Sequence, residues 1–122
     1  MLYLAHKLIK KEIVKDIKER LISSPDWIDG RETALGGAKK IKKNLQLKVG
    51  PSYSIFAKQV SEILQNDRLL EAYAMPAKIF SLLFSRTGVG MFYGPHCDMP
   101  FSPVGRRDLS FTIFLNEPSE YE

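Results

Sequence analysis

A histidine and an aspartate two positions apart, His96 and Asp98, have the clearest capacity for chemistry in this sequence. They stand within MFYGPHCDMP, residues 91–100, and the chain contains only 2 histidines. Residues i and i+2 of an extended segment project to the same side, so the imidazole and the carboxylate would face one point. Gly94 permits a close backbone approach, and Pro95 stiffens the chain just before the pair.

A nitrogen ligand and an oxygen ligand at this spacing point to an iron site. They supply two of the three ligands of a facial triad, which holds Fe(II) on one face and leaves positions open for a cosubstrate and oxygen. The spacing alone is common, however. It is also compatible with a surface loop in which both side chains are solvated, or in which the aspartate caps a turn. The choice between these interpretations depends on the surrounding elements.

The elements that would position the pair are helices followed by strands. Apolar residues recur at helical spacing over residues 10–22 and 51–65. Alternation of apolar and polar residues predicts strands over 43–49 and 108–115, and an apolar run rich in large residues predicts another over 77–87. The loop with the His–Asp pair separates the last two of these strands. Helices first and sheet afterwards predict an α+β fold.

The composition is typical of a single soluble domain. The chain has 122 residues, of which 44% are apolar and 26% charged, and its net charge is +4. Two basic runs, 6–20 and 39–43, raise the possibility of nucleic-acid binding, but acids interleave with the lysines of the first, so this partner is not expected. A single cysteine excludes an internal disulfide framework and agrees with a cytoplasmic location. No apolar run approaches the roughly 20 residues of a membrane span.

Three segments of the chain carry a family resemblance. They are DGRETALGGAKKIKKNLQL (29–47), FSRTGVGMFYGPHCD (84–98) and RRDLSFTIFLNEPSEYE (106–122). In this order and spacing they resemble the PKHD-type hydroxylases, which are prolyl-hydroxylase-like dioxygenases that depend on Fe(II) and 2-oxoglutarate. The resemblance covers nearly the whole chain and favours the iron interpretation of the His–Asp pair.

The resemblance implies a fold and an iron site. The implied fold is a double-stranded β-helix, or jelly-roll barrel, against which N-terminal helices pack. Residues 1–122 would be one domain, with a helical and mixed region over 1–75 and the first barrel strands, including the His-x-Asp motif, over 76–122. His96 and Asp98 would be the first two iron ligands.

The resemblance also implies a reaction. Oxidative decarboxylation of 2-oxoglutarate would be coupled to hydroxylation of a C–H bond in a peptidyl or small-molecule substrate. Fe(II) is the implied cofactor, 2-oxoglutarate and oxygen are the cosubstrates, and ascorbate is an additional candidate. Tyr93 and Arg86 are candidates for contact with 2-oxoglutarate, and Asn44 and Gln46 for lining the substrate groove. In the alternative interpretation, the Tyr93 hydroxyl and the Arg86 head group lie in water, and Asn44 and Gln46 belong to a solvated strand face.

The chain departs from the family pattern at the third iron ligand. In the family a distal histidine and a basic residue that holds 2-oxoglutarate follow the segment in which this sequence ends. The other histidine, His6, precedes every expected barrel strand. We therefore expect the N-terminal portion of a longer hydroxylase, inactive alone. The alternatives are a metal-free module that binds partners or forms a homo-oligomer through the strand edges of an incomplete barrel, and a small nucleic-acid-binding protein.

Overall fold

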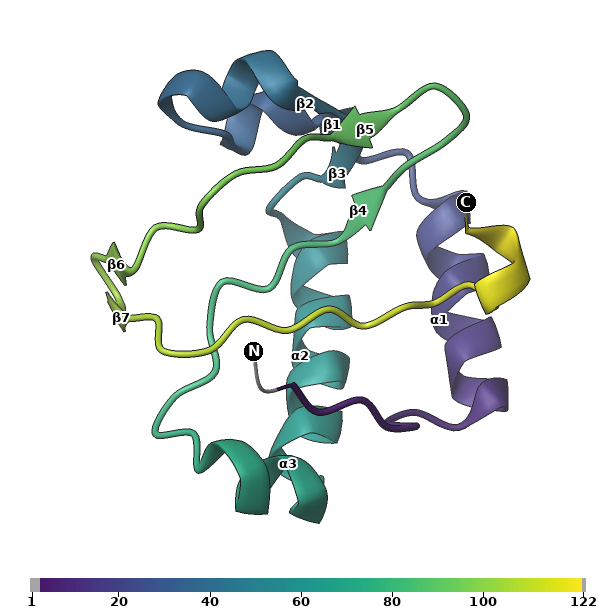
Figure 1. The fold of residues 1–122 in the computed structure, drawn as a ribbon. Helices are drawn as coiled ribbons and strands as arrows, with labels where there is room; N and C mark the ends of the chain where they lie inside the picture. Colours follow the sequence, from purple (N-terminus) through teal and green to yellow (C-terminus); the bar gives the residue numbers. More distant parts are fainter. Residues whose placement is uncertain (1–2, 122) are drawn as a thin grey trace.

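Two helices packed side by side, with short antiparallel strands across one end, form most of the structure, a computed structural model that describes residues 3–121 (Figure 1). The helices and strands are α1 (Lys11–Ser23), β1 (Trp27–Asp29), β2 (Lys42–Lys43), β3 (Leu45–Leu47), α2 (Pro51–Gln65), α3 (Arg68–Ala74), β4 (Ser85–Arg86), β5 (Phe92–Tyr93), β6 (Phe101–Ser102) and β7 (Gly105–Arg106). Three short 3-10 helices are η1 (Gly30–Thr33), η2 (Gly36–Ile41) and η3 (Pro118–Glu120).

The two long helices form where their apolar spacing predicts them, as α1 and α2. The second begins at Pro51, whose fixed φ and missing N–H suit the first position of a helix. The sequence analysis did not predict α3. Its start is fixed by Asp67, whose carboxylate accepts a hydrogen bond of 2.7 Å from the backbone N–H of Leu70. This side-chain cap satisfies one of the free N–H groups at the start of the helix.

The hydrophobic core lies between the two helices and the sheet. Ile17 and Leu21 of α1 pack with Phe56 of α2 and Leu47 of β3. Partly buried residues surround this centre: Trp27, Tyr53, Ile63, Phe84 and Leu115. Two of these, Phe84 and Leu115, come from extended segments late in the chain, so the second half of the sequence closes the core that the helices begin.

The strands pair in three small antiparallel sheets. The largest has the order β1-β3-β4, β2 pairs with β5, and β6 pairs with β7. In the first sheet Gln46 lies opposite Ser85, and in the second Lys42 lies opposite Tyr93. Because side chains alternate along a strand, Lys42, Asn44 and Gln46 project to one side, opposite to the side on which Leu47 enters the core.

The predicted later strands are much shorter than expected. Over 77–87 only β4 forms, and the strand predicted over 108–115 is absent from the described residues. The latter segment runs extended across α2 to α1 (Figure 1), but no strand lies beside it to complete a hydrogen-bonded ladder. Leu109 is consequently 61% exposed. The predicted mix of helices and antiparallel strands is confirmed, whereas a jelly-roll barrel does not appear in residues 3–121; the division at residue 75 remains a prediction.

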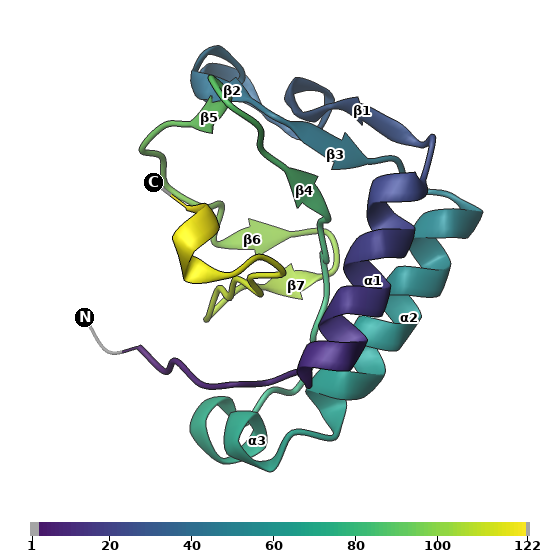
Figure 2. The same cartoon turned by 90° about the vertical axis from the view of Figure 1, so that its right-hand side faces the viewer.

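Two ion pairs and one partly buried side chain hold the end of the chain against α1. Lys11 Nζ lies 3.5 Å from Glu117 Oε1, and Lys18 Nζ lies 3.4 Å from Glu120 Oε1. Such surface pairs contribute only ~0–1 kcal/mol each. The packing of Leu115 against the core is therefore the stronger anchor. Figure 2 shows α1 and α2 side by side on one side of the molecule and the C-terminal η3, in yellow, on the other.

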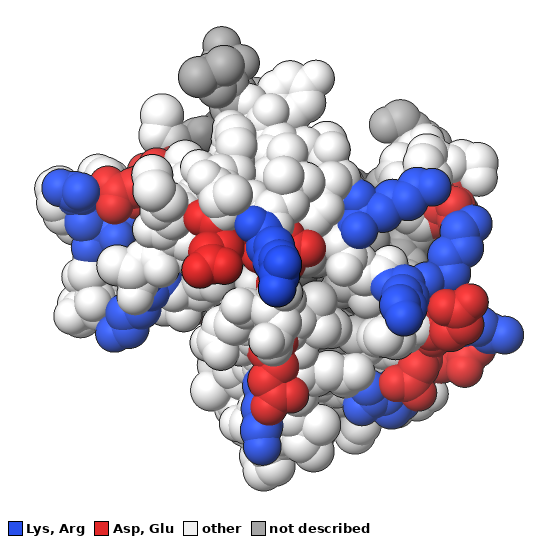
Figure 3. All heavy atoms as spheres, turned by 90° about the horizontal axis from the view of Figure 1, so that it is seen from below, with Lys and Arg blue, Asp and Glu red and all other residues white. Residues whose placement is uncertain are grey.

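Charges of both signs are interspersed along α1 and over the face shown in Figure 3. Asp16 pairs with Arg20 and Glu19 with Lys15, each one helical turn apart. The basic run at the start of the chain is thus partly neutralised by its own helix. None of the helices in residues 3–121 combines the length and the apolar character that a membrane crossing requires.

Replacing Ile17 by alanine is expected to lower the free energy of unfolding by about 2–5 kcal/mol, because the deletion leaves a cavity in a packed core. Ile17 is 0% exposed. The control is Ile22→Ala on the same helix, where the side chain is 50% exposed and the change should cost much less. Urea unfolding followed by far-UV circular dichroism measures both. Equal losses in the two variants would contradict the described core.

Candidate functional site

His96 and Asp98 face each other in the loop that follows β5. His96 Nε2 lies 3.5 Å from Asp98 Oδ1, so the predicted convergence of the two side chains is confirmed. Adjacent ligands of one octahedral ion, each about 2.1 Å from the metal, lie about 3 Å apart. A shift of about half an ångström would therefore let both atoms bind one ion. A nitrogen and a carboxylate oxygen are a donor set that suits Fe(II).

The remaining nitrogen of His96 is held by the backbone. Nδ1 lies 2.8 Å from the carbonyl oxygen of Gly94. A carbonyl only accepts hydrogen bonds, so Nδ1 carries the hydrogen and Nε2 presents its lone pair in the neutral imidazole. Metal-binding histidines are commonly oriented by such a bond from the other ring nitrogen.

The remaining oxygen of Asp98 is held by a side chain from far along the sequence. Ser110 Oγ donates a hydrogen bond of 2.9 Å to Asp98 Oδ2, which leaves Oδ1 directed towards His96. The sequence analysis missed Ser110. Its place on the polar side of the alternating segment 108–115 was the available signal, because a polar residue there can face the loop.

Gly94 places this loop against the 3-10 helix η2. Its backbone N–H donates a hydrogen bond of 2.7 Å to the carbonyl oxygen of Ile41. A Cβ atom at position 94 would lie 3.2 Å from the Cβ of Ile41, tighter than ordinary packing allows. The predicted close backbone approach is confirmed, and it explains why glycine stands two residues before the histidine.

The ring of Tyr93 connects the pair to β2. It stacks on the imidazole of His96, with 3.7 Å between ring centroids and 16° between the ring planes. Lys42 Nζ lies 5.0 Å from the centre of the same tyrosine ring. The predicted contact of Tyr93 with 2-oxoglutarate remains a prediction, but the structure places this residue directly beside His96.

Asn44 and Gln46 are buried, so the alternative of a solvated strand face is wrong. Gln46 Oε1 contacts Thr33 Oγ1, and its Nε2 lies 3.4 Å from Ser85 Oγ. Asn44 Oδ1 has no hydrogen-bond partner among the described residues and lies against Gly30, where no side chain would fit. Neither amide contacts His96 or Asp98 in the structure, and their role in a substrate groove remains a prediction.

The structure does not place Arg86 beside His96 and Asp98. Ser85 lies opposite Gln46 across the sheet, so Arg86, the next residue, projects to the other face. Its side chain is exposed. The proposed contact of Arg86 with 2-oxoglutarate gains no support from this placement.

Lys42 is a second residue of this site that the sequence analysis overlooked. It is only 5% exposed, and its Nζ donates a hydrogen bond of 3.0 Å to Thr33 Oγ1. Burial lowers the pKa of Lys42, and the nearby charge of Asp29 opposes this shift. That carboxylate is bound by Arg31, whose hydrogen bonds hold the pKa of Asp29 at about 2. The alternation in KNLQL could have identified Lys42, since it shares a side with Asn44 and Gln46.

A third ligand does not join the pair within residues 3–121, where no three histidine, cysteine, aspartate or glutamate side chains come together to hold a metal. His6 lies elsewhere, with its Nε2 3.5 Å from Asp67 Oδ1 at the start of α3. The site in this chain is therefore a pair of candidate ligands and the groups that orient them.

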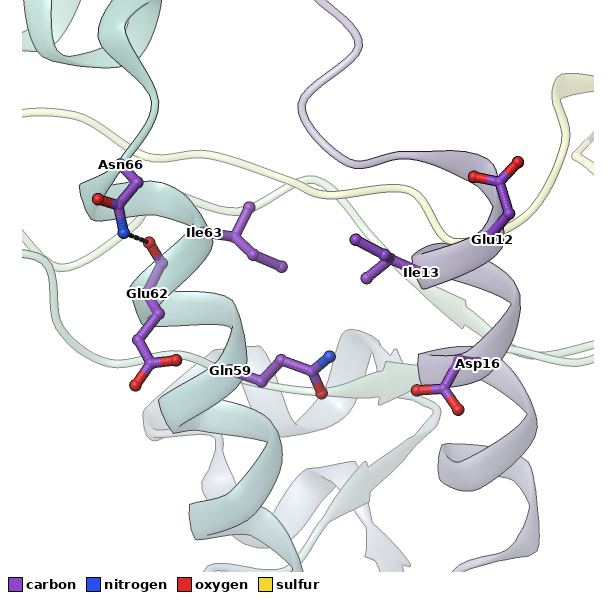
Figure 4. Close-up of a pocket in the computed structure, with 7 residues that line it drawn as sticks. All are labelled: Glu12, Ile13, Asp16, Gln59, Glu62, Ile63 and Asn66. Carbon is purple, nitrogen blue, oxygen red and sulfur yellow. Dashed lines mark hydrogen bonds between the residues drawn. The ribbon is translucent and has the colours of Figure 1, made fainter.

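A groove of about 530 Å³ lies apart from this pair, between α1 and α2 (Figure 4). Ile13 and Ile63 face each other across it, and carboxylates stand at its rim. Asp16, one of these acids, is paired with Arg20. The groove contains none of the predicted site residues, and we interpret it as a gap in the packing between the two helices.

Comparison with known proteins gives consistent matches. A PKHD-type hydroxylase of Prochlorococcus marinus strain MIT 9211 is 40% identical over 121 residues, which are 98% of this chain and 55% of the relative. A PKHD-type hydroxylase of Synechococcus sp. strain CC9605 is 42% identical over 125 residues, which are 100% of this chain and 56% of the relative. This chain is homologous to the PKHD-type hydroxylases. It spans about half the length of these PKHD-type relatives. No protein-family model matches the chain, and no solved structure gives a significant match.

Replacing Lys42 by methionine is expected to raise the free energy of unfolding at neutral pH by about 1 kcal/mol, because an apolar side chain costs less to bury than a charge. The lowered pKa of Lys42 determines how the free energy of unfolding depends on pH. Between that pKa and the ordinary lysine value of 10.5 the unfolded wild-type chain binds more protons than the folded chain, so wild-type stability rises with pH.

The stability difference between Lys42→Met and wild type should therefore shrink as the pH approaches 10.5. Lys43→Met is the control, because Lys43 is exposed on the other side of the same strand. Urea unfolding at several pH values measures all three proteins. A large loss of stability in Lys42→Met alone would show that the ammonium stabilises the fold.

Proposed function

We propose that this chain contributes the first two metal ligands, His96 and Asp98, of an Fe(II)- and 2-oxoglutarate-dependent dioxygenase that hydroxylates a peptidyl or small-molecule substrate. One observation carries the proposal. The two facing atoms are 3.5 Å apart, while the other polar atom of each side chain is held by Gly94 or Ser110. The name of the relatives, PKHD-type hydroxylase, supports an oxidoreductase of this kind.

Each residue of the pair and its neighbours would have a distinct role in such a site. Bound iron and 2-oxoglutarate would supply the oxidation of the C–H bond, with ascorbate as an additional reductant. When the imidazole of His96 is neutral, its Nε2 presents the lone pair, because Nδ1 donates its hydrogen to the carbonyl oxygen of Gly94. Asp98 supplies negative charge at an oxygen that Ser110 keeps directed at the histidine. Tyr93 covers one face of the imidazole and limits its rotation.

The third ligand and the cation for 2-oxoglutarate would come from protein outside residues 3–121. The proposal is that they belong to a part corresponding to the rest of the PKHD-type relatives, of which this chain matches about half. The same part would add strands beside 108–115 and complete a barrel. A cytoplasmic location belongs to the proposal too, since the exposed thiol of Cys97 is compatible with a reducing compartment.

A second candidate function is a metal-free module that associates with another chain. Leu109, Phe111 and Phe114 are all exposed on a segment without a neighbouring strand. An extended segment of this kind can pair with a strand of another molecule. Sedimentation velocity separates the two candidates, because this module requires a complex in solution and the metal site does not.

Fe(II) added without oxygen to the 122-residue chain is expected to bind weakly and to broaden the NMR signals of His96 and Asp98 selectively. His96→Ala should weaken this binding tenfold or more, because one of two ligands is lost. His6→Ala is the matched control, since it removes the other histidine of the chain. Equal Fe(II) binding by wild type and His96→Ala would exclude the proposed ligand.

Ser110→Ala is expected to weaken Fe(II) binding by about 10–100-fold, as is usual for residues that orient a metal ligand. Ser110→Thr keeps the hydroxyl and should retain most of the affinity. Thr112→Ala, two residues along the same segment, is the control. The same NMR titration measures all three variants, and an unchanged affinity in Ser110→Ala would show that Asp98 does not depend on this hydrogen bond.

A further inference from the structure

We propose that Lys42 is an anion-binding group of the His96 and Asp98 site, and that it takes one carboxylate of a small molecule bound there. The choice of a small organic acid rests on the proposed function. The location and the charge of the group rest on the structure alone.

Within residues 3–121, Lys42 is a buried cation without a counter-ion. It is 5% exposed, and no carboxylate oxygen of the described residues forms an ion pair with its Nζ. Asp29, whose charge acts on Lys42, is already engaged by Arg31, whose Nε lies 2.9 Å from Asp29 Oδ2. A buried charge without a partner is costly. Such groups are concentrated at functional sites, where a ligand supplies the missing charge.

The position of Lys42 connects it to the candidate ligands. Lys42 and Tyr93 are directly opposed across the β2–β5 pair, so their side chains share one face. The ammonium lies 5.0 Å from the centre of the tyrosine ring, and that ring stacks on the imidazole of His96. One aromatic ring therefore separates the cation from the histidine, a separation that a small organic acid can span.

The ammonium is held in place before any ligand arrives. Its hydrogen bond to Thr33 Oγ1 uses one of three N–H donors, so donors remain for an incoming anion. Thr33 is itself fixed by donating a bond of 2.9 Å to the carbonyl oxygen of Gly30 and by contact with Gln46. This arrangement reduces the conformational entropy that a ligand must remove on binding.

The surroundings of Lys42 favour a carboxylate over a phosphate. Lys42 offers a single positive charge, and the groups that its ammonium contacts are the Thr33 hydroxyl and the Tyr93 ring. One carboxylate matches that charge, whereas a phosphate dianion would be only half compensated. Because the cation for 2-oxoglutarate is proposed to lie outside residues 3–121, the carboxylate assigned to Lys42 is one carried by the substrate, and the experiment must separate it from the distal carboxylate of 2-oxoglutarate.

The test is an NMR titration of the metal-free 122-residue chain, observing the Lys42 Nζ group and the backbone amides of Thr33 and Tyr93. The probes are 2-oxoglutarate, 2-oxobutyrate, which lacks the distal carboxylate, N-acetylglycine and inorganic phosphate. Wild type and Lys43→Met should show saturable shifts with a carboxylate probe. In Lys42→Met the affinity should fall at least tenfold, while Lys42→Arg, which keeps the charge, should retain part of it.

The two sources give different patterns. Tight binding of 2-oxoglutarate over 2-oxobutyrate, with that preference lost in Lys42→Met, would instead assign Lys42 to the distal carboxylate of the cosubstrate and would contradict the substrate assignment. Shifts with N-acetylglycine but not with 2-oxoglutarate assign a substrate carboxylate.

The proposal is overturned if no carboxylate shifts these signals, if Lys42→Met responds like wild type, or if only phosphate binds. His96→Ala separates this result from the proposed function. If that variant binds the carboxylate but wild type and variant bind Fe(II) equally, the dioxygenase proposal fails while Lys42 keeps its role.

Discussion

The pairing of β2 with β5 is the interaction on which the rest of the site depends. It joins the segment that follows η2 to the strand just before the His–Asp loop, with Lys42 opposite Tyr93. The hydrogen bond from Gly94 to Ile41 continues the same alignment by one step and leads the chain into the loop. Tyr93 then lies beneath Lys42 and beside His96, so one short antiparallel pair sets the relative positions of all three side chains.

The helices support this pair from a distance. The core between α1 and α2 receives Leu47 from β3, the strand that directly follows the segment of Lys42 and Asn44. Because strand side chains alternate, burying Leu47 on the helix side turns Gln46 to the opposite side, where Thr33 and Ser85 contact it. Hydrophobic packing on one face of β3 therefore determines which polar groups gather on the other.

The sequence predicted well those features that depend on local spacing. The periodicity that defines α1 and α2 lies within each helix, and the i, i+2 spacing of His96 and Asp98 was sufficient to predict that they converge. The strands over 77–87 and 108–115 were predicted too long, because alternation records which side chains could be buried but not whether a neighbouring strand exists. The burial of Asn44 and Gln46 was missed for a related reason: their cover comes from residues distant along the chain.

The bond between Ser110 and Asp98 makes the two candidate ligands differ in how firmly they are held. Ser110 belongs to a segment without ladder hydrogen bonds, held mainly by Leu115 and by ion pairs at the surface. Segments with few buried contacts open locally at a low free-energy cost. Each local opening of 108–115 would release Asp98 while His96 stays held by Gly94 and Tyr93. The orientation of the aspartate therefore depends on a segment that opens easily, whereas the orientation of the histidine does not.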